Sequence, residues 1–134
     1  MDKLLKDRVA VVCGSTAGIG KAIAFDFARL GARVIVLARN EEKLRNVIKE
    51  LKSFSEEEHD FLQVDFSDTQ IFENRIKQFF NQIPKVDILV NNTGGPPAGT
   101  AFEADVSEFT SAFNNHLVCN HYLMQTLVPG MRKN

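Results

Sequence analysis

The sequence is poor in the residues that mark several classes of protein. It has two cysteines, four prolines and no tryptophan in 134 residues. Cys13 and Cys119 are too few and too far apart for a disulfide framework or a metal-ligand motif, so we expect reduced thiols and no metal site. No apolar run approaches the roughly 18 residues of a membrane-spanning helix, and the start lacks a signal-peptide cleavage site. These absences predict a cytoplasmic protein with no membrane partner.

Neither sign of charge dominates the chain. Lysine and arginine number 16 against 17 aspartates and glutamates, which gives a net charge of −1. A charge this small draws the chain neither to nucleic acid nor to an anionic membrane, and aromatic–basic clusters are missing as well. The 44% of hydrophobic and 25% of charged residues are ordinary for a globular protein and exclude intrinsic disorder. The length predicts a single domain over residues 1–134.

Short apolar runs alternate with amphipathic stretches along the chain. The expected strands are residues 8–13, 33–37, 59–64 and 86–90. The expected helices are residues 18–30, 41–54, 69–81 and 106–128, the last ended by Pro129 and Gly130. Because the strand runs are continuously apolar, they are typical of parallel strands covered by helices on both faces. We therefore predict an α/β fold, a Rossmann-type doubly wound parallel sheet truncated to about four strands in the order 3-2-1-4.

A glycine-rich turn joins the first expected strand to the first expected helix. Gly14, Gly18 and Gly20 follow the spacing G-x-x-x-G-x-G. Gly14 permits a tight turn, Gly18 lets the backbone approach a phosphate, and Gly20 lets the helix pack near the sheet. The helix start then offers free N–H groups to a pyrophosphate. The alternative is a turn without a ligand, whereas Lys21 lacks the context of a P-loop lysine.

Four landmarks in this order resemble the short-chain dehydrogenase/reductase family. They are CGSTAGIG at 13–20, VD at 64–65, VDILVNNTG at 86–94 and LVPGM at 127–131. The family fingerprints are T-G-x-x-x-G-I-G and N-N-A-G. The loop NNTGGPPAG is also similar to that of 3-oxoacyl-(acyl carrier protein) reductases. The resemblance runs over residues 8–131 and corresponds to the N-terminal, cofactor-binding half of the family domain.

The resemblance implies an oxidoreductase that transfers a hydride between NADP(H) and a small carbonyl or alcohol substrate. In the family a catalytic Ser and a Tyr-x-x-x-Lys motif follow this region. Here the single tyrosine is Tyr122, and Thr126 stands where the lysine would be. We therefore expect the catalytic half to be absent and this chain alone to be inactive. The alternatives are a non-catalytic dinucleotide-binding fragment or a degenerate family member; a Rossmann methyltransferase is disfavoured by the missing acid after the second strand.

The residue that closes the second strand decides between the two nicotinamide cofactors. An acidic residue there would bind the ribose 2′-hydroxyl and repel a 2′-phosphate. This chain offers Arg39 and Asn40 instead, followed by two glutamates. Arg39 could hold the phosphate, with Ser15 or Thr16 adding hydroxyl donors, so NADP(H) is preferred and NAD(H) remains possible. The alternative is that Arg39 is simply solvated.

The resemblance also assigns contacts beyond the glycine turn. Asp65 would accept from the adenine amino group, Phe66 would add backbone contacts, and Asn91 would line the ribose. An alternative for Asp65 is to cap the turn before the following helix. The full expected cofactor-binding set is Gly14, Ser15, Thr16, Gly18, Ile19, Gly20, Arg39, Asn40, Asp65, Phe66, Asn91, Thr93 and Gly94.

Two positions depart from the family pattern. Cys13 replaces a Thr and Thr93 replaces an Ala, so the hydroxyl has either crossed between adjacent strands or been lost and gained independently. Cys13 would then be a buried structural thiol. His116 stands at the position of the catalytic Asn, where it could titrate near neutral pH and replace a proton relay, or simply pack. A shifted register would restore Asn114 or Asn115 to that position.

The remaining expectations concern histidines and association. His59 and His121 carry no motif and are interpreted as surface or boundary residues. The fourth strand would be an exposed edge, which invites pairing with another chain. The last helix carries an apolar stripe and a second apolar face, which predicts a homo-oligomer unless the stripe is all core. The stripe is Phe109, Phe113, Leu117, Met124 and Leu127, and the second face is Val118 and Tyr122.

Overall fold

The computed structural model describes residues 3–83, 85–92 and 99–133, which form a parallel sheet between two layers of helices. The strands are β1 (Val9–Cys13), β2 (Arg33–Ala38), β3 (Asp60–Gln63) and β4 (Ile88–Val90). The helices are α1 (Gly18–Arg29), α2 (Glu41–Lys52), α3 (Thr69–Phe80), α4 (Val106–Phe113), the π-helical turn η1 (Asn114–Val118) and α5 (Cys119–Met131).

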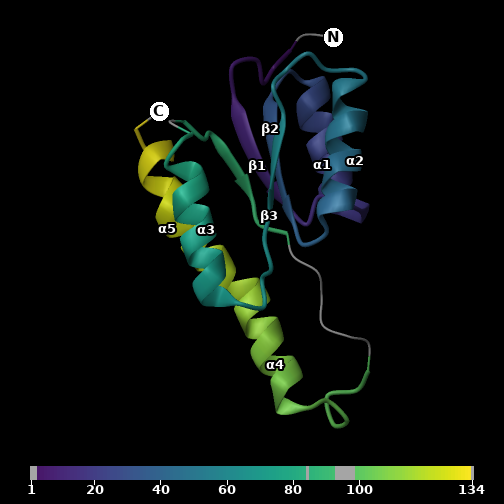
Figure 1. Ribbon diagram of the computed structural model, residues 1–134, viewed down its shortest axis with the longest axis vertical. Coiled ribbons are helices and arrows are strands. Elements are labelled where there is room, and N and C mark those ends of the chain that lie inside the picture. The colour runs from purple at the N-terminus through teal and green to yellow at the C-terminus, as the bar shows by residue number, and fades with distance from the viewer. Residues whose placement is uncertain (1–2, 84, 93–98, 134) are drawn as a thin grey trace.

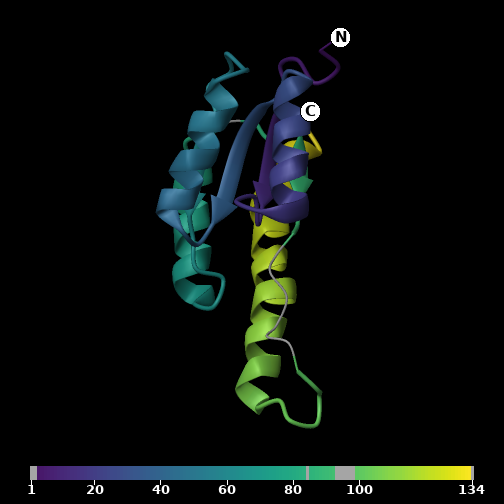
Figure 2. The same ribbon diagram turned by 90° about the vertical axis from the view of Figure 1, so that its right-hand side faces the viewer.

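The strand order is β3-β2-β1-β4 and all pairings are parallel, which confirms the predicted topology. Helices α1 and α2 cover one face of the sheet, while α3 and α5 lie together on the other (Figures 1 and 2). Alternate β1 residues enter the two cores. Val11 and Cys13 pack with α3 and α5, whereas Ala10 and Val12 pack with α1 and α2. The central strands are therefore buried on both faces, as their unbroken apolar runs predict.

The first turns of the helices differ in how their N–H groups are satisfied. The side-chain oxygen of Asn40 accepts from the N–H of Lys43 at 3.0 Å and caps α2. That of Asp68 accepts from the N–H of Ile71 at 3.1 Å and caps α3. Helix α1 follows Ala17, makes no side-chain cap bond and has no acidic residue in its first turn. Its N-terminal N–H groups thus remain available to a partner.

The last helical segment differs from the prediction of one helix over residues 106–128. A π-helical turn separates α4 from α5, and the N–H of Cys119 donates to the carbonyl of Asn114, five residues back. Helix α5 also continues through Pro129 and Gly130 to Met131. Pro129 lies in the final turns, where its missing N–H forfeits one helical bond, and the N–H of Arg132 still donates to Val128 at 2.9 Å.

The segment just before β4 is held against β1 by the side chain and backbone of Asp87, where the sequence had predicted a longer strand. The expected strand began at residue 86, but β4 begins at Ile88. Asp87 donates its N–H to the carbonyl of Val9 at 2.8 Å, and its Oδ2 accepts from the N–H of Val9 at 2.9 Å. Arg8 and Lys85 lie 3.4 and 3.5 Å from the same carboxylate. Asp87 therefore fastens the start of β4 to β1.

His59 is a buried hydrogen-bonding group, which corrects its interpretation as a surface or boundary residue. Only 6% of the residue is exposed. Its Nδ1 accepts from the N–H of Val34 at 3.0 Å, so Nε2 carries the proton that donates to Ser55 Oγ at 2.9 Å. The imidazole takes the place of a backbone acceptor just before β3 pairs with β2. His121 is exposed, as expected.

Among the described residues, no helix is long and apolar enough to cross a membrane.

We expect the fold to lose stability as the pH falls below about 6.5, because His59 must stay neutral to accept from Val34. Burial, and then the charges of Lys52 and Arg33, lower the pKa of His59 below its ordinary value. The unfolded chain therefore binds a proton at a higher pH than the folded chain does, and acidification favours unfolding. Urea unfolding across this range measures the effect. A His59→Asn variant, which keeps an acceptor near the Nδ1 position, should show a flatter pH dependence; equal slopes would contradict this role.

Candidate functional site

The glycine turn lies at the carboxyl end of β1, where the chain enters α1. Gly14 and Gly18 have φ angles of 59° and 57°, in the left-handed region that favours glycine. The N–H of Gly14 donates to the carbonyl of Leu37 at 3.0 Å, which continues the β1–β2 ladder into the turn. The turn is thus held by the sheet and presents the start of α1 at the sheet's carboxyl edge.

Three backbone segments meet at this turn without room for a side chain. A Cβ on Gly20 would lie 2.2 Å from the carbonyl oxygen of Gly14, and one on Gly14 would lie 2.4 Å from the carbonyl oxygen of Asn92. The side-chain amide of Asn92 also donates to the carbonyl of Cys13 at 3.4 Å. This contact gives Gly20 the close-packing role that its spacing predicted. It also identifies Asn92, which the sequence reasoning had passed over in favour of Asn91.

Space beside the turn is open where a ligand would approach. A Cβ on Gly18 would meet no described atom within 4 Å. Ser15 is completely buried, and its Oγ has no hydrogen-bond partner in the described part of the chain. Ile19 is 74% exposed on the first turn of α1, and Thr16 is half-buried. An orphaned hydroxyl, free helix N–H groups and an uncovered apolar side chain suit a ligand with both anionic and apolar parts.

Arg39 and Asn40 follow β2, on the same edge of the sheet. Arg39 is exposed, and its carbonyl accepts from the side chain of Gln63 at 3.1 Å. Its guanidinium forms no ion pair among the described residues. Asn40, by contrast, already uses its side-chain oxygen to cap α2. The structure therefore leaves the charge of Arg39 free for a ligand and gives Asn40 a structural task.

Asp65 lies after β3, within electrostatic reach of Arg39. Its Oδ1 accepts from both the N–H and the hydroxyl of Ser67, at 2.9 and 2.7 Å. These bonds, with a smaller contribution from Arg39, lower the pKa of Asp65. Asp65 thus stabilises the turn before α3, the alternative role considered from the sequence. Both bonds involve Oδ1, so Oδ2 keeps the capacity to accept from a ligand.

Phe66 contributes to the core beneath this edge. Its ring packs against Phe72 with centroids 4.9 Å apart, and its carbonyl accepts from the thiol of Cys119 at 3.2 Å. Cys13 is fully buried in the same core, and burial raises the pKa of its thiol to about 12. A thiol so far from ionisation is a structural group, as predicted for Cys13.

The last predicted cofactor positions follow β4. Asn91 is exposed immediately after the strand. Thr93 and Gly94 lie outside the described residues, and so does the exchange of a hydroxyl between positions 13 and 93 that the sequence suggested.

The π-helical turn η1 contains His116 and Asn115, and Asn120 follows it at the start of α5. His116 is half-buried, and its carbonyl accepts from the side-chain amide of Asn120 at 2.6 Å. The side-chain oxygens of Asn115 and Asn120 are buried and have no hydrogen-bond partner among the described residues. A π turn holds one more residue than an α turn. His116 remains the residue that a gapless count back from Pro129 places at the family's Asn position, and Asn115 precedes it in the same turn.

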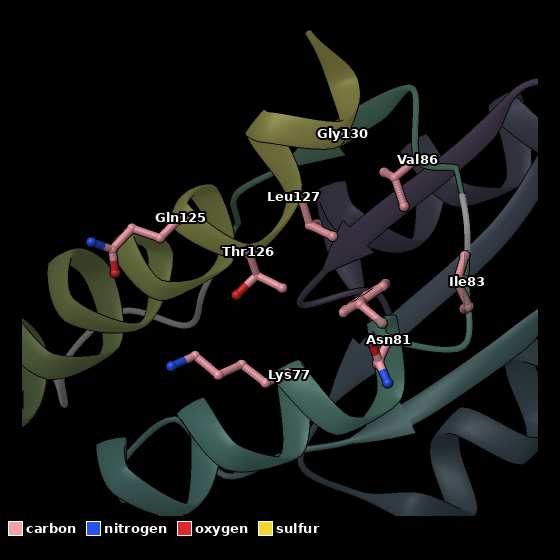
Figure 3. Close-up of a pocket in the computed structure, with 9 residues that line it drawn as sticks. Lys77, Asn81, Ile83, Val86, Gln125, Thr126, Leu127 and Gly130 are labelled. Atoms are coloured by element: carbon pink, nitrogen blue, oxygen red, sulfur yellow. The ribbon is translucent and has the colours of Figure 1, made fainter. Parts of the chain in front are cut away.

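A cavity of about 480 Å³ lies away from the glycine turn, between α3, α5 and the approach to β4 (Figure 3). Apolar side chains of Ile83, Val86 and Leu127 line one part of it, and polar Lys77 and Thr126 line another. None of the described residues predicted to bind a cofactor lines this cavity. The candidate site therefore lies at the carboxyl ends of the strands, around the glycine turn.

Comparison with known proteins points to one family. The family model described as short chain dehydrogenase matches residues 8–134. Dehydrogenase/reductase SDR family member 7B of Xenopus tropicalis is 30% identical over 135 residues, and 7alpha-hydroxysteroid dehydrogenase of Escherichia coli K12 is 31% identical over 130. Each alignment covers 97% of this chain but only 44% and 50% of the relative. The chain thus spans about half the length of the curated relatives it matches.

Solved structures agree with this assignment. L-Sorbose reductase from Gluconobacter frateurii, crystallised with NADPH and L-sorbose, is 31% identical and superposes with a TM-score of 0.88. The match covers 99% of this chain and 51% of that one.

A Gly20→Ala substitution should destabilise the fold by about 1–3 kcal/mol, because the added methyl group meets the backbone of Gly14. Gly18→Asn should stay within about 1 kcal/mol of the wild type, since the space there is open and asparagine tolerates positive φ. Chemical denaturation of both variants measures the difference. Equal stability of the Gly20 variant and the wild type would show that the close approach is not a constraint.

Proposed function

The chain belongs to the short-chain dehydrogenase/reductase family, and from this premise we propose that it binds NADP(H) at the glycine turn. The observation that carries the proposal is the buried hydroxyl of Ser15, which has no hydrogen-bond partner among the described residues and lies beside the start of α1, where Ala17 provides no side-chain cap. Oxygens of a pyrophosphate would accept from this hydroxyl and from the free N–H groups of the helix. The open space at Gly18 would admit the phosphates to the backbone, and exposed Ile19 would be covered by the ligand.

The preference for NADP(H) rests on the charge at the end of β2. Arg39 supplies a guanidinium, without an ion pair in the part of the chain that the structure describes, where an acid would be needed to select NAD(H). Thr16 would add a hydroxyl donor. Asp65 would accept from the adenine amino group through Oδ2, with Phe66 and Asn91 alongside. The NADPH complex of the related L-sorbose reductase supports this choice of cofactor.

We further infer that the chain supplies the cofactor-binding part of an oxidoreductase acting on a small carbonyl or alcohol. The nicotinamide, when bound, supplies or accepts the hydride. The residues of this chain bind and orient the dinucleotide. The sequence contains no Tyr-x-x-x-Lys motif, so we expect no turnover from these 134 residues alone. A substrate of the 3-oxoacyl-(acyl carrier protein) kind is one class within this proposal, and a non-catalytic dinucleotide-binding module is the alternative.

For proton relay we propose the π-helical turn, with Asn115 favoured over His116. The buried side-chain oxygen of Asn115 has no partner among the described residues, so it can accept from a water or a reacting group.

We also propose that the chain forms homo-oligomers and resides in the cytoplasm. Figure 1 shows α4 extending beyond the sheet, and its apolar side chains Val106, Phe109 and Phe113 are more than half exposed, as is Leu117 in η1. Leu127, expected on the same stripe, is buried in the core instead. The surface available for association is therefore the α4 and η1 end of the stripe, with the open edge of β4.

Titration should show that the chain binds NADPH more tightly than NADH, and that Arg39→Asp reverses this preference. A charge-assisted bond contributes about 1.5–3 kcal/mol, which corresponds to roughly tenfold or more in affinity. Fluorescence or calorimetric titration of both cofactors measures the ratio.

Two further variants separate cofactor choice from cofactor binding. Arg39→Gln should remove the preference without reversing it. Gly18→Asp should lower the affinity for both cofactors, because aspartate tolerates the backbone conformation but brings negative charge to the phosphate position. Gly18→Asn should lower the affinity less. Equal affinities of the wild type for both cofactors would refute the NADP(H) preference, and unchanged binding by Gly18→Asp would refute the site.

Light scattering during size exclusion should give a mass above the 15.0 kDa of one chain. Replacing Phe109 and Phe113 by serine should shift the equilibrium toward monomer, because these exposed rings would lose their partner surface. A monomer across a wide concentration range would contradict the proposed association.

A further inference from the structure

The outer edge of β3 lies at the opposite end of the sheet from β4 and offers backbone groups for pairing. The N–H of Val64 donates to the carbonyl of Ala38 in β2 at 2.9 Å. Backbone groups of alternate residues in a strand point the same way, so those of Leu62 also face β2. The N–H and carbonyl groups of Phe61 and Gln63 therefore face the open edge, where no described strand lies.

Two grooves flank this edge, one on each face of the sheet. On the α2 face, a groove of about 400 Å³ is lined by Arg45, Lys49, Lys52 and the ring of Phe61. On the α3 face, a groove of about 340 Å³ is lined by the apolar residues Leu62 and Phe79 and by the polar residues Arg75, Gln78 and Gln82. Because Phe61 and Leu62 are adjacent in β3, the grooves are the spaces that alternate side chains of an added strand would enter.

The α2 groove carries a ridge of positive charge. Arg45, Lys49 and Lys52 are all exposed and follow one another by four and three residues, about 6 and 4.5 Å along the helix axis. Arg45 pairs with Glu41 at 2.7 Å, but the two lysines form no ion pair in the described part of the chain. Asp60 is the acidic residue that lines the groove.

We propose that the edge of β3 receives an extended peptide of alternating acidic and apolar residues as a further strand. Its side chains on one face would recur about every 6.8 Å, close to the step of about 6 Å from Arg45 to Lys49 along the helix axis. Acidic side chains would thus meet Arg45 and Lys49, with Lys52 adding positive charge beside them, while apolar side chains between them would pack on Leu62 and Phe79 in the other groove. Main-chain bonds to Phe61 and Gln63 would supply affinity, and the two grooves would supply specificity.

The same charges disfavour a second copy of this chain at this edge. Pairing β3 with β3 of another copy would bring the cationic ridges of the two α2 helices together, and such contact between like charges disfavours the pairing. Asp60 adds a further guard, since its Oδ1 accepts from the N–H of Phe61 at 2.7 Å. An incoming strand must displace this carboxylate from the N–H of Phe61, so Asp60 lowers the affinity for an added strand.

The test uses the 134-residue chain and a short synthetic peptide of alternating glutamate and valine. Amide exchange and chemical shifts of Phe61 and Gln63, followed by NMR, should show protection that saturates with peptide. Lys49→Glu should weaken binding on the order of tenfold, whereas Lys43→Glu, an equal charge change on exposed α2 surface outside the groove, should change it little. Asp60→Ala should strengthen binding, because it frees the N–H of Phe61.

A second peptide of equal charge, with proline in place of valine, separates strand pairing from simple attraction of anions. It should fail to protect the two amides, because proline does not fit a paired strand. Equal binding of both peptides would overturn the proposal in favour of a non-specific anion patch. No binding of the alternating peptide, or protection that rises with protein concentration alone, would overturn it as well. Circular dichroism checks that each variant remains folded.

Discussion

The contact of Gly14, Gly20 and Asn92 is the constraint on which the rest of the structure depends. Three backbone segments, from the end of β1, the first turn of α1 and the end of β4, approach one another too closely for any Cβ at either glycine. This approach brings the start of α1 against the sheet and fixes where its N–H groups emerge. Because Ala17 provides no side-chain cap, the contact leaves the first N–H groups of α1 without a capping side chain at the carboxyl ends of the strands.

A parallel sheet buried on both faces makes this edge the natural place for function. Residues Ala10–Cys13 of β1 and Val34–Leu37 of β2 are completely buried and have no surface to offer a ligand. The segments that leave the strands supply Ser15, Arg39 and Asp65, which lie at one edge because all four strands run the same way. At the other end, Asp87 holds β4 against β1 with paired bonds to Val9. The site is thus positioned by strands that contribute no side chain to it.

The sequence predicted the strand order and most helix bounds because burial and backbone geometry leave direct marks on composition. Unbroken apolar runs indicate strands covered on both faces, and glycine spacing indicates a close approach. The sequence could not predict features that depend on which segments of the chain lie next to one another in the folded structure. The hydrogen bond that Val34 donates to His59 leaves no periodic pattern in the sequence. The π turn differs from an α turn in its hydrogen bonds, and Asn92 differs from Asn91 in that it contacts Gly14.

The outer strands β4 and β3 differ in the chemistry of the surface that each would offer to a partner. The residues of β4 are half-buried, and exposed apolar side chains lie separately on η1 and on α4, which extends beyond the sheet (Figure 1). Burying these exposed apolar side chains against another apolar surface, such as a second copy of the chain, would lower the free energy. Beside β3, lysines and a self-capping carboxylate reject a copy and leave only an acidic strand well matched. Because β3 and β4 are the outermost strands in the order β3-β2-β1-β4, a partner strand paired with one of them would not occupy the outer edge of the other.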